Sequence, residues 1–203
     1  MAVVVAFLAF CALLGFPAFQ AAMVLPGNNI WKLTQVSSFS WSNCEGTFPG
    51  EIHSLSLSPD PVNIPGDIKV KAEGSTTVPL TSPVKVAIKL QKEILDLWVD
   101  VPCVDHIGSC TYDNVCDILD NLIPPGQPCP EPLETYGILC HCPFKAGVYS
   151  FPESNFYLPD VSLPSWAANG NYRTTVTVSS GNQVVGCIKI TFSLKSNSGW
   201  HWK

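Results

Sequence analysis

Hydrophobic and polar residues alternate along several stretches of the chain, which is the pattern of β-strands with one buried and one wet face. The alternation runs through residues 68–73 and 84–91. Two further alternating rows, at 172–178 and 188–194, lie on either side of the turn residues at 180–182. A strand, a short polar turn containing glycine and a second strand predict a β-hairpin near the end of the chain.

Shorter patterns complete the expected elements. Further short strands are predicted at 37–41, 55–57 and 148–151. Apolar residues recur at helical spacing across 115–122 until Pro124, which is expected to end the helix. The sequence therefore predicts an antiparallel all-β body with one short helix.

The first 22 residues differ in character from the rest. Residues 1–22 are apolar, carry no charged side chain and end in small residues, which is typical of a secretory signal peptide. The alternative is a transmembrane anchor, but the apolar run is interrupted at Pro17, short of the roughly 20 residues that span a bilayer. Cleavage would remove Cys11 and send the mature chain along the oxidising secretory route.

Six of the nine cysteines lie in one segment, between Cys103 and Cys142, separated by glycine-rich and proline-rich turns. Such a segment cannot bury enough apolar surface to hold its own path, so cross-links are expected. Without the leader eight cysteines remain, and four disulfides are the default for a secreted chain. A zinc site using Cys116 with Cys140, His141 and Cys142 is the rival, but paired Cys-x-x-Cys knuckles are absent.

The charge balance narrows the range of partners. The formal net charge is −5, only 13% of residues are charged, and 46% are hydrophobic. This balance argues against a nucleic-acid partner. With a sequence pI near 5.2, the chain would lose most of its net negative charge near pH 5. We therefore expect its adsorption to anionic membranes to strengthen from pH 7 to pH 5.

Two apolar stretches do not alternate. Residues 94–99 follow directly on a complete strand, and residues 155–166 place large side chains between prolines, so both are expected to be loops. Apolar side chains gathered in loops are typical of a surface that contacts lipid or a hydrophobic partner. The other interpretation is that these loops fold over the core as lids.

Six short motifs carry a family resemblance. They are SFSWSNC (38–44), GSTTVPL (74–80), IGSCT (107–111), CPEPL (129–133), CHCPFK (140–145) and LPSW (163–166). Together they resemble the ganglioside-activator family, the lysosomal cofactors of β-hexosaminidase A within the wider ML lipid-recognition family. The resemblance covers about residues 37–195, with a signal peptide before it and a tail at 196–203.

The resemblance implies a fold and a pairing of cysteines. The fold would be an antiparallel β-cup of about eight strands enclosing a lipid cavity, with one short helix and a disulfide-rich segment. The implied disulfides are Cys44 with Cys187, Cys103 with Cys110, Cys116 with Cys142, and Cys129 with Cys140.

It also implies a function without catalysis. The chain would extract gangliosides from lysosomal membranes and present them to a β-hexosaminidase A-like hydrolase, with transient contact to an anionic membrane surface and no cofactor. It would reach the lysosome lumen through the secretory pathway and be partly secreted. The lipid-binding residues implied at the rim and mouth are Leu95, Leu97, Trp98, Phe156, Leu158, Val161, Leu163, Trp166 and Tyr172. For Tyr172 an ordinary strand tyrosine is the equal alternative.

Two other classes of function stay open. Ser109 beside Asp105 and His106 suggests a lipase-like site, although chain neighbours rarely form a catalytic triad and no Gly-x-Ser-x-Gly motif is present. A sterol or immune lipid carrier of the ML type, with no enzyme partner, is the third class. The tail, with Trp200 and Trp202, is either a disordered end or an added interfacial anchor.

Overall fold

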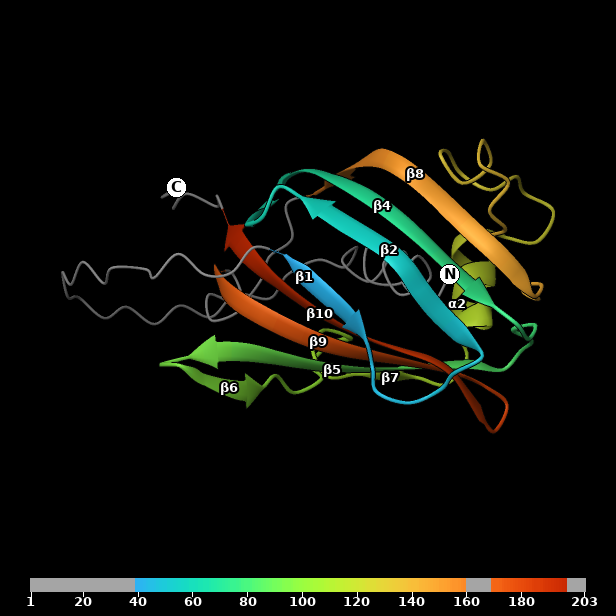
Figure 1. Cartoon of the computed structure of the whole chain (residues 1–203). Coiled ribbons are helices and arrows are strands. Elements are labelled where there is room, and N and C mark those ends of the chain that lie inside the picture. Colours follow the sequence, from blue (N-terminus) through green and yellow to red (C-terminus); the bar gives the residue numbers. More distant parts are fainter. Residues whose placement is uncertain (1–38, 160–168, 197–203) are drawn as a thin grey trace.

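The computed structural model describes residues 39–159 and 169–196 of the chain (Figure 1). The expected leader, the tail beyond Ser196 and the rim residues Val161, Leu163 and Trp166 lie outside these ranges. The described elements are β1 (Ser40–Asn43), β2 (Gly50–Ser58), β3 (Val62–Ile64), β4 (Gly66–Thr76), β5 (Val84–Ile94), β6 (Leu97–Asp100), β7 (Thr111–Tyr112), α2 (Val115–Leu122), β8 (Gly147–Leu158), β9 (Asn169–Ser180) and β10 (Gln183–Ser196).

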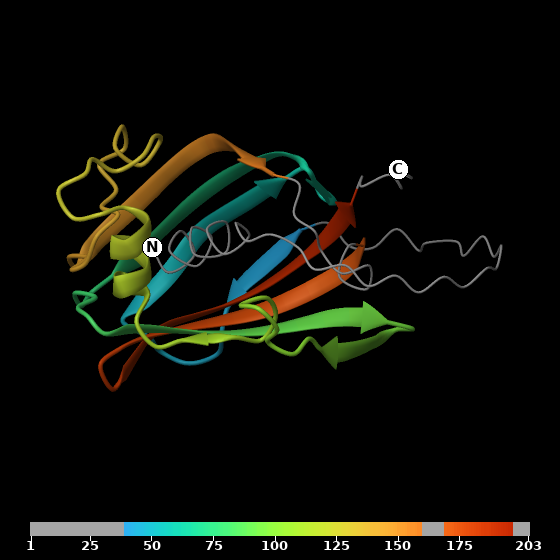
Figure 2. The ribbon, with the colours of Figure 1, turned by 180° about the vertical axis from the view of Figure 1, so that it is seen from behind.

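The strands form two sheets that face each other as the walls of a cup (Figures 1 and 2). The larger, seven-stranded sheet has the order β1-β10-β9-β5-β6, with β3 added beside β10 and β7 beside β5. The three-stranded sheet has the order β2-β4-β8. All pairings are antiparallel except that of β3 with β10. The predicted antiparallel all-β cup is confirmed; its strand number is higher because β3 and β7, of three and two residues, are too short to show an alternating pattern.

The predicted alternation matches the observed faces. In β4, Ile68, Val70 and Ala72 are buried, whereas Lys69 and Lys71 are exposed. β9 and β10 pair through almost their whole length and are joined at the predicted turn. The period of two is therefore the direct cause of the two-walled architecture, since each wall buries one row of side chains and wets the other.

The prediction that residues 94–99 and 155–166 are apolar loops is wrong for those of them that the structure describes. Leu95 and Asp96 have φ of 51° and 62°, so they make a two-residue turn that continues β5 into β6. Sequence signals of such turns are Asn-Gly or Asp-Gly, which Leu-Asp does not resemble. The residues up to Leu158 extend β8, whose Pro152 lies at a bulge on a sheet edge, where the missing N–H costs no ladder bond.

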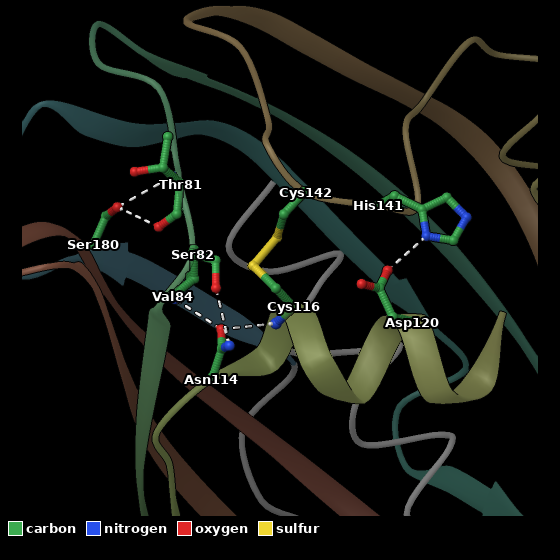
Figure 3. The surroundings of a disulfide bond; sticks show 9 residues. All are labelled: Thr81, Ser82, Val84, Asn114, Cys116, Asp120, His141, Cys142 and Ser180. Atoms are coloured by element: carbon green, nitrogen blue, oxygen red, sulfur yellow. Dashed lines mark hydrogen bonds and ion pairs between the residues drawn. A yellow bond between two sulfur atoms is a disulfide. The ribbon is translucent and has the colours of Figure 1, made fainter. Parts of the chain in front are cut away.

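The predicted helix is confirmed and is fixed across one end of the cup. The side chain of Asn114 caps α2 by accepting a hydrogen bond from the Cys116 backbone N–H at 3.3 Å (Figure 3). The same Oδ1 accepts from the Val84 N–H at 3.1 Å, and the Asn114 amide donates to Ser82 at 3.0 Å. One side chain thus joins the helix to the start of β5.

Four disulfides are present, and they are the pairs that the family resemblance implies. They join Cys44 to Cys187, Cys103 to Cys110, Cys116 to Cys142, and Cys129 to Cys140. The first connects the end of β1 to β10, and the third fastens α2 to the segment that precedes β8 (Figure 3). Because all eight sulfurs are bonded, none of these cysteines is a zinc ligand.

The cup has two unlike ends. We call the end that carries α2, the start of β5 and the β9–β10 turn the closed end. The opposite end, with the β5–β6 hairpin, Leu158 and the last residues of β10, is the open end (Figure 2). None of the helices that the structure describes has the length and hydropathy needed to cross a membrane.

Candidate functional site

A large apolar cavity lies between the two sheets, toward the open end. It contains about 110 Å³ that the centre of a water molecule can occupy, within about 1120 Å³ of empty space that includes its open mouth. Its walls come from both sheets and from the loop before β7: Phe39, Leu55, Leu57, Val62, Ile64, Ile68, Val70, Ile88, Leu90, His106, Gly108, Tyr112, Leu158, Thr174, Val176, Ile190, Phe192 and Leu194. Almost all of these side chains are hydrocarbon, so the cavity suits an acyl chain.

The sequence pattern explains why both walls are apolar. The cavity residues of β4, β5 and β9 belong to the same alternating rows that predicted the strands. An inward row is apolar whether another layer fills the space beneath it or not. The rows therefore predicted the wall but not the hollow.

The β5–β6 hairpin extends the open end with exposed apolar side chains. Leu95 and Leu97 are 88% and 68% exposed, and Ile94 and Val99 are about half exposed. The hairpin is at the open end, with the last residues of β8 and β10 (Figure 1). Apolar side chains concentrated on a projecting turn are typical of a membrane or partner contact rather than of a core.

The two described residues of the second apolar stretch have different surroundings. Leu158 is buried and lines the cavity. Phe156 is half-buried; its ring stacks on Phe151 at 5.7 Å between centroids, and the pair packs with the disulfide-rich segment. Phe156 is not among the cavity-lining residues.

Tyr172 is almost fully buried beside the cavity. Its ring stacks on Phe192, with centroids 5.7 Å apart, and the Lys92 Nζ lies 5.6 Å from the ring centroid on the other side. Burial raises the pKa of Tyr172 to about 12, and burial also lowers the pKa of Lys92. Lys92 pairs with Tyr172 in the sheet, two residues beyond Leu90, so it continues the inward row of β5 toward the mouth.

Trp98 is held on the outer face of the larger sheet. The Arg173 guanidinium lies 4.6 Å from the Trp98 ring centroid, and the Arg173 Nε also donates to the side-chain Oε1 of Gln91 at 2.6 Å. Trp98 pairs with Glu93, whose side chain accepts from Asn171 at 2.7 Å. Trp98 therefore flanks the exposed leucines from the outer face.

The loop closed by the Cys103–Cys110 disulfide supplies a third part of the cavity wall, which sequence reasoning missed. Val104 and Ile107 exchange two backbone hydrogen bonds of 2.8 Å around a tight turn. Gly108 has a φ of 110°, and a Cβ there would meet the Pro102 carbonyl oxygen, so only glycine fits. The loop thereby brings His106 and Gly108 to the cavity. Only the glycine-containing turn signalled it in the sequence.

Ser109 serves this loop rather than a catalytic site. Its hydroxyl accepts from the Leu90 N–H at 3.0 Å and donates to the Leu90 carbonyl oxygen at 3.1 Å. The hydroxyl's donor and one of its acceptor positions thus hold the loop against β5. Among the described residues no group of three or more His, Cys, Asp or Glu side chains could hold a metal ion.

The family model that matches this chain is that of the ML domain, over residues 38–194. This chain belongs to the ML family. Curated relatives named Ganglioside GM2 activator are 54% identical over 177 residues in Mus musculus and 55% identical over 164 residues in Macaca fascicularis. The alignments cover 86% and 80% of this chain and 92% and 86% of the relatives.

Two solved structures are similar to this chain at much lower sequence identity. A Niemann-Pick type C2 protein from Japanese carpenter ant is 15% identical, with a TM-score of 0.40, over 77% of this chain and 99% of that one. Chicken MD-1 complexed with lipid IVa is 13% identical, with a TM-score of 0.32, over 77% of this chain and 88% of that one.

Family membership and the cavity lead to the same conclusion. The ML domain binds lipids, and the described part of this one holds an apolar cavity between its sheets. The chain is a lipid-binding protein and is not itself an enzyme.

Proposed function

We propose that this protein extracts gangliosides from lysosomal membranes and presents them to a β-hexosaminidase A-like hydrolase. The observation that carries the proposal is an apolar cavity whose mouth lies at the same end as an exposed apolar hairpin. The name of the two relatives, Ganglioside GM2 activator, supports a glycosphingolipid as the cargo.

The energy of lipid transfer explains why such a protein is needed. A ceramide carries on the order of 30 methylenes, and at about 0.8 kcal/mol each their transfer to water costs roughly 25 kcal/mol. A cavity lined by Leu, Ile and Val offers the tails surroundings close to those of the bilayer. Extraction then becomes nearly isoenergetic, and the sugar head group stays in water for a hydrolase.

The hairpin supplies the contact with the membrane. Leu95 and Leu97 are exposed at its tip, so their insertion among lipid head groups removes apolar surface from water at no cost to the core. Loss of net negative charge between pH 7 and pH 5 would reduce repulsion from anionic membranes. The apolar leader expected at 1–22 supports delivery through the secretory pathway to the lysosome lumen, with partial secretion.

A coupled transfer and hydrolysis assay tests the proposal. Donor vesicles carry a panel of gangliosides and neutral glycolipids, and the readouts are the lipid moved to acceptor vesicles and the sugar released by β-hexosaminidase. The proposal predicts ganglioside transfer without the hydrolase and a large gain in sugar release with both proteins present. Sugar release that the protein does not increase would contradict the presentation step.

A cavity-filling variant gives the matched control. Ile190→Trp adds bulk inside the cavity, whereas Thr175→Trp places the same tryptophan on the opposite face of the same sheet. Transfer should fall with the first variant and persist with the second. Transfer of sterol alone, with no effect on the hydrolase, would instead favour the ML carrier without an enzyme partner.

A further inference from the structure

Thr174 is a polar residue in a wall that is otherwise nearly all hydrocarbon. It lies on the inward row of β9, two residues from Val176. Its partners in the adjoining strands are Leu90 of β5 and Ile190 of β10. All four residues line the cavity.

The Thr174 hydroxyl is buried without a hydrogen-bond partner. Its Oγ1 atom has almost no exposed surface and bonds to none of the residues that the structure describes. A buried hydroxyl left unpaired costs about 1–3 kcal/mol, whereas valine has the same shape, no such cost and a strong preference for strands. Folding alone therefore favours valine at this position. Because Oγ1 has almost no accessible surface, the hydroxyl turns away from the empty cavity, and rotation about χ1, which exchanges hydroxyl and methyl, would bring it to a ligand. A hydroxyl at this position is then explained by a ligand that pairs with it in that rotamer.

The position along the wall indicates which part of a ligand is reached. The row deeper in the cavity is Ile88 and Val176, and the next row toward the mouth is Lys92, Tyr172 and Phe192. Each row is about 6.6 Å along the strand from the next. Polarity thus increases along the inward rows, from hydrocarbon, through one hydroxyl, to a row that holds the partly buried Lys92 and the almost fully buried Tyr172 beside the cavity.

A lipid that enters tails first has the same order of groups. Its acyl chains are hydrocarbon, its head group is polar or charged, and the carbonyl or hydroxyl groups that link them lie in between. A threonine hydroxyl can donate to such a carbonyl and can accept from such a hydroxyl.

We propose that Thr174 is the hydrogen-bonding anchor for the polar linkage of the bound lipid, and that it fixes how deeply the tails enter. The inference rests on the proposed lipid-carrier function and adds to it a residue that distinguishes a linked lipid from plain hydrocarbon. The shared chemistry is a carbonyl or hydroxyl next to the tails, as in the amide of a ceramide or the ester of a glycerolipid.

Binding measurements on the full chain with three probes test the inference. The probes are a fluorescent ceramide glycoside, a fluorescent diacylglycerol glycoside and the hydrocarbon fluorophore diphenylhexatriene. Thr174→Val should weaken binding of at least one linked lipid about 5- to 15-fold, since one hydrogen bond is lost. The same variant should bind diphenylhexatriene as tightly as the wild type or more tightly. Loss with the ceramide alone identifies the amide linkage, and loss with both identifies a carbonyl of either kind.

Thr175→Val is the matched control, because it makes the same change at the next residue on the opposite face of β9. It should leave all three affinities unchanged. Equal weakening of the hydrocarbon and the linked lipids by Thr174→Val would show a change in cavity shape and overturn the inference. Unchanged affinity for both linked lipids would overturn it as well. A wild-type protein that binds no glycolipid contradicts the proposed function, whereas glycolipid binding that the variant does not alter contradicts this inference alone.

Discussion

The closed and open ends of the cup use the same strands but are filled differently. Along β5, Val84 and Val86 are fully buried in a cluster that includes Val115 of α2 and Phe144. The next two residues of the same row, Ile88 and Leu90, line the cavity, and at Ile94 the row is half exposed. One continuous apolar row thus passes from a packed core, through a cavity wall, to a surface.

The difference teaches that a strand pattern determines which side chains point inward but not what they meet there. At the closed end α2 and the disulfide-linked segment lie across the gap between the sheets, and a pocket there holds about 30 Å³, compared with about 110 Å³ for the cavity. At the open end β3 joins the two sheets along one edge, since it pairs with β10 and connects β2 to β4, and no described helix lies across the gap. Stability should therefore depend mainly on the closed end, and lipid binding mainly on the open end.

The largest expected effect concerns the disulfides. Replacing Cys44 and Cys187 by alanine releases a cross-link between positions 143 residues apart, which should lower the free energy of unfolding by about 4–5 kcal/mol on the chain-entropy account. Replacing Cys103 and Cys110, only seven residues apart, should cost about 2 kcal/mol on the same account. The second change should instead weaken lipid binding, because that loop carries part of the cavity wall. Urea unfolding and lipid titration of both variants measure the two effects, and equal stability losses would contradict the contrast.

A matched pair of isoleucines separates the two ends within one strand. Ile188 is buried in the closed-end cluster, and Ile190, two residues along the same face of β10, lines the cavity. Ile188→Ala should destabilise the protein by about 3 kcal/mol, because Ile188 is almost fully buried in the closed-end cluster and the space that it lines there is only about 30 Å³. Ile190→Ala should cost about 1 kcal/mol, since it only enlarges an existing space.

Lipid titration of the same pair completes the test. Ile190→Ala should change the affinity for lipid, whereas Ile188→Ala should leave it unchanged under conditions where the variant is folded. If the two alanines destabilise equally, the cavity wall is packed and the contrast between the ends fails.

A pair of exposed sites tests whether the open end contacts membranes. Changing both Leu95 and Leu97 to serine should reduce binding to anionic liposomes about 10- to 100-fold, because the apolar area available for insertion is lost. Val148 is 70% exposed at the start of β8, near α2, so Val148→Ser is the control at the closed end. Liposome flotation measures the binding. If both changes reduce liposome binding equally, exposed apolar residues at either end promote membrane binding, and the open end has no special role.

The smallest expected effect is a dependence on alkaline pH at Tyr172. Burial raises the pKa of Tyr172 to about 12 from an ordinary 10.0. Because the folded state favours the neutral phenol, the resulting stability is fully present below pH 10 and is lost as the pH rises through about 12. In the Tyr172→Phe variant, the free energy of unfolding measured in urea should therefore change less between pH 10 and about 12 than in the wild type. The tyrosines of the wild-type protein can be titrated by absorbance at 295 nm. If none of them has a pKa above the ordinary 10.0, Tyr172 is not buried as described.

Much of the wall could be predicted from sequence, because each wall strand shows its faces by alternation. Ile68 and Val70 are one example, and the helix that ends before Pro124 is another case of a local signal. The disulfide pairs were not deducible from spacing and came from the family resemblance. That resemblance also named Leu95, Leu97 and Leu158, which are found at the open end.

Three features of the site gave no such signal. The turn at Leu95 and Asp96 places two ordinary residues at positive φ, and nothing in their sequence distinguishes an apolar hairpin from an apolar loop. His106 reaches the cavity only through a loop that is closed by the Cys103–Cys110 disulfide and held against β5 by Ser109, and neither contact is marked by a local sequence pattern. The unpaired hydroxyl of Thr174 is invisible in sequence, because an inward threonine reads as an ordinary strand residue.

Photo-crosslinking tests the central claim, that the open end is a hollow that takes lipid tails, most directly. A ganglioside that carries a diazirine near the end of its acyl chain is bound to the protein and irradiated, and the labelled residues are identified by peptide mass spectrometry. The account predicts labels on cavity-wall residues such as Ile88, Val176 and Ile190 and none on Val84, Val115 or Phe144. Labels confined to the exposed hairpin, with the cavity wall unmarked, would contradict it.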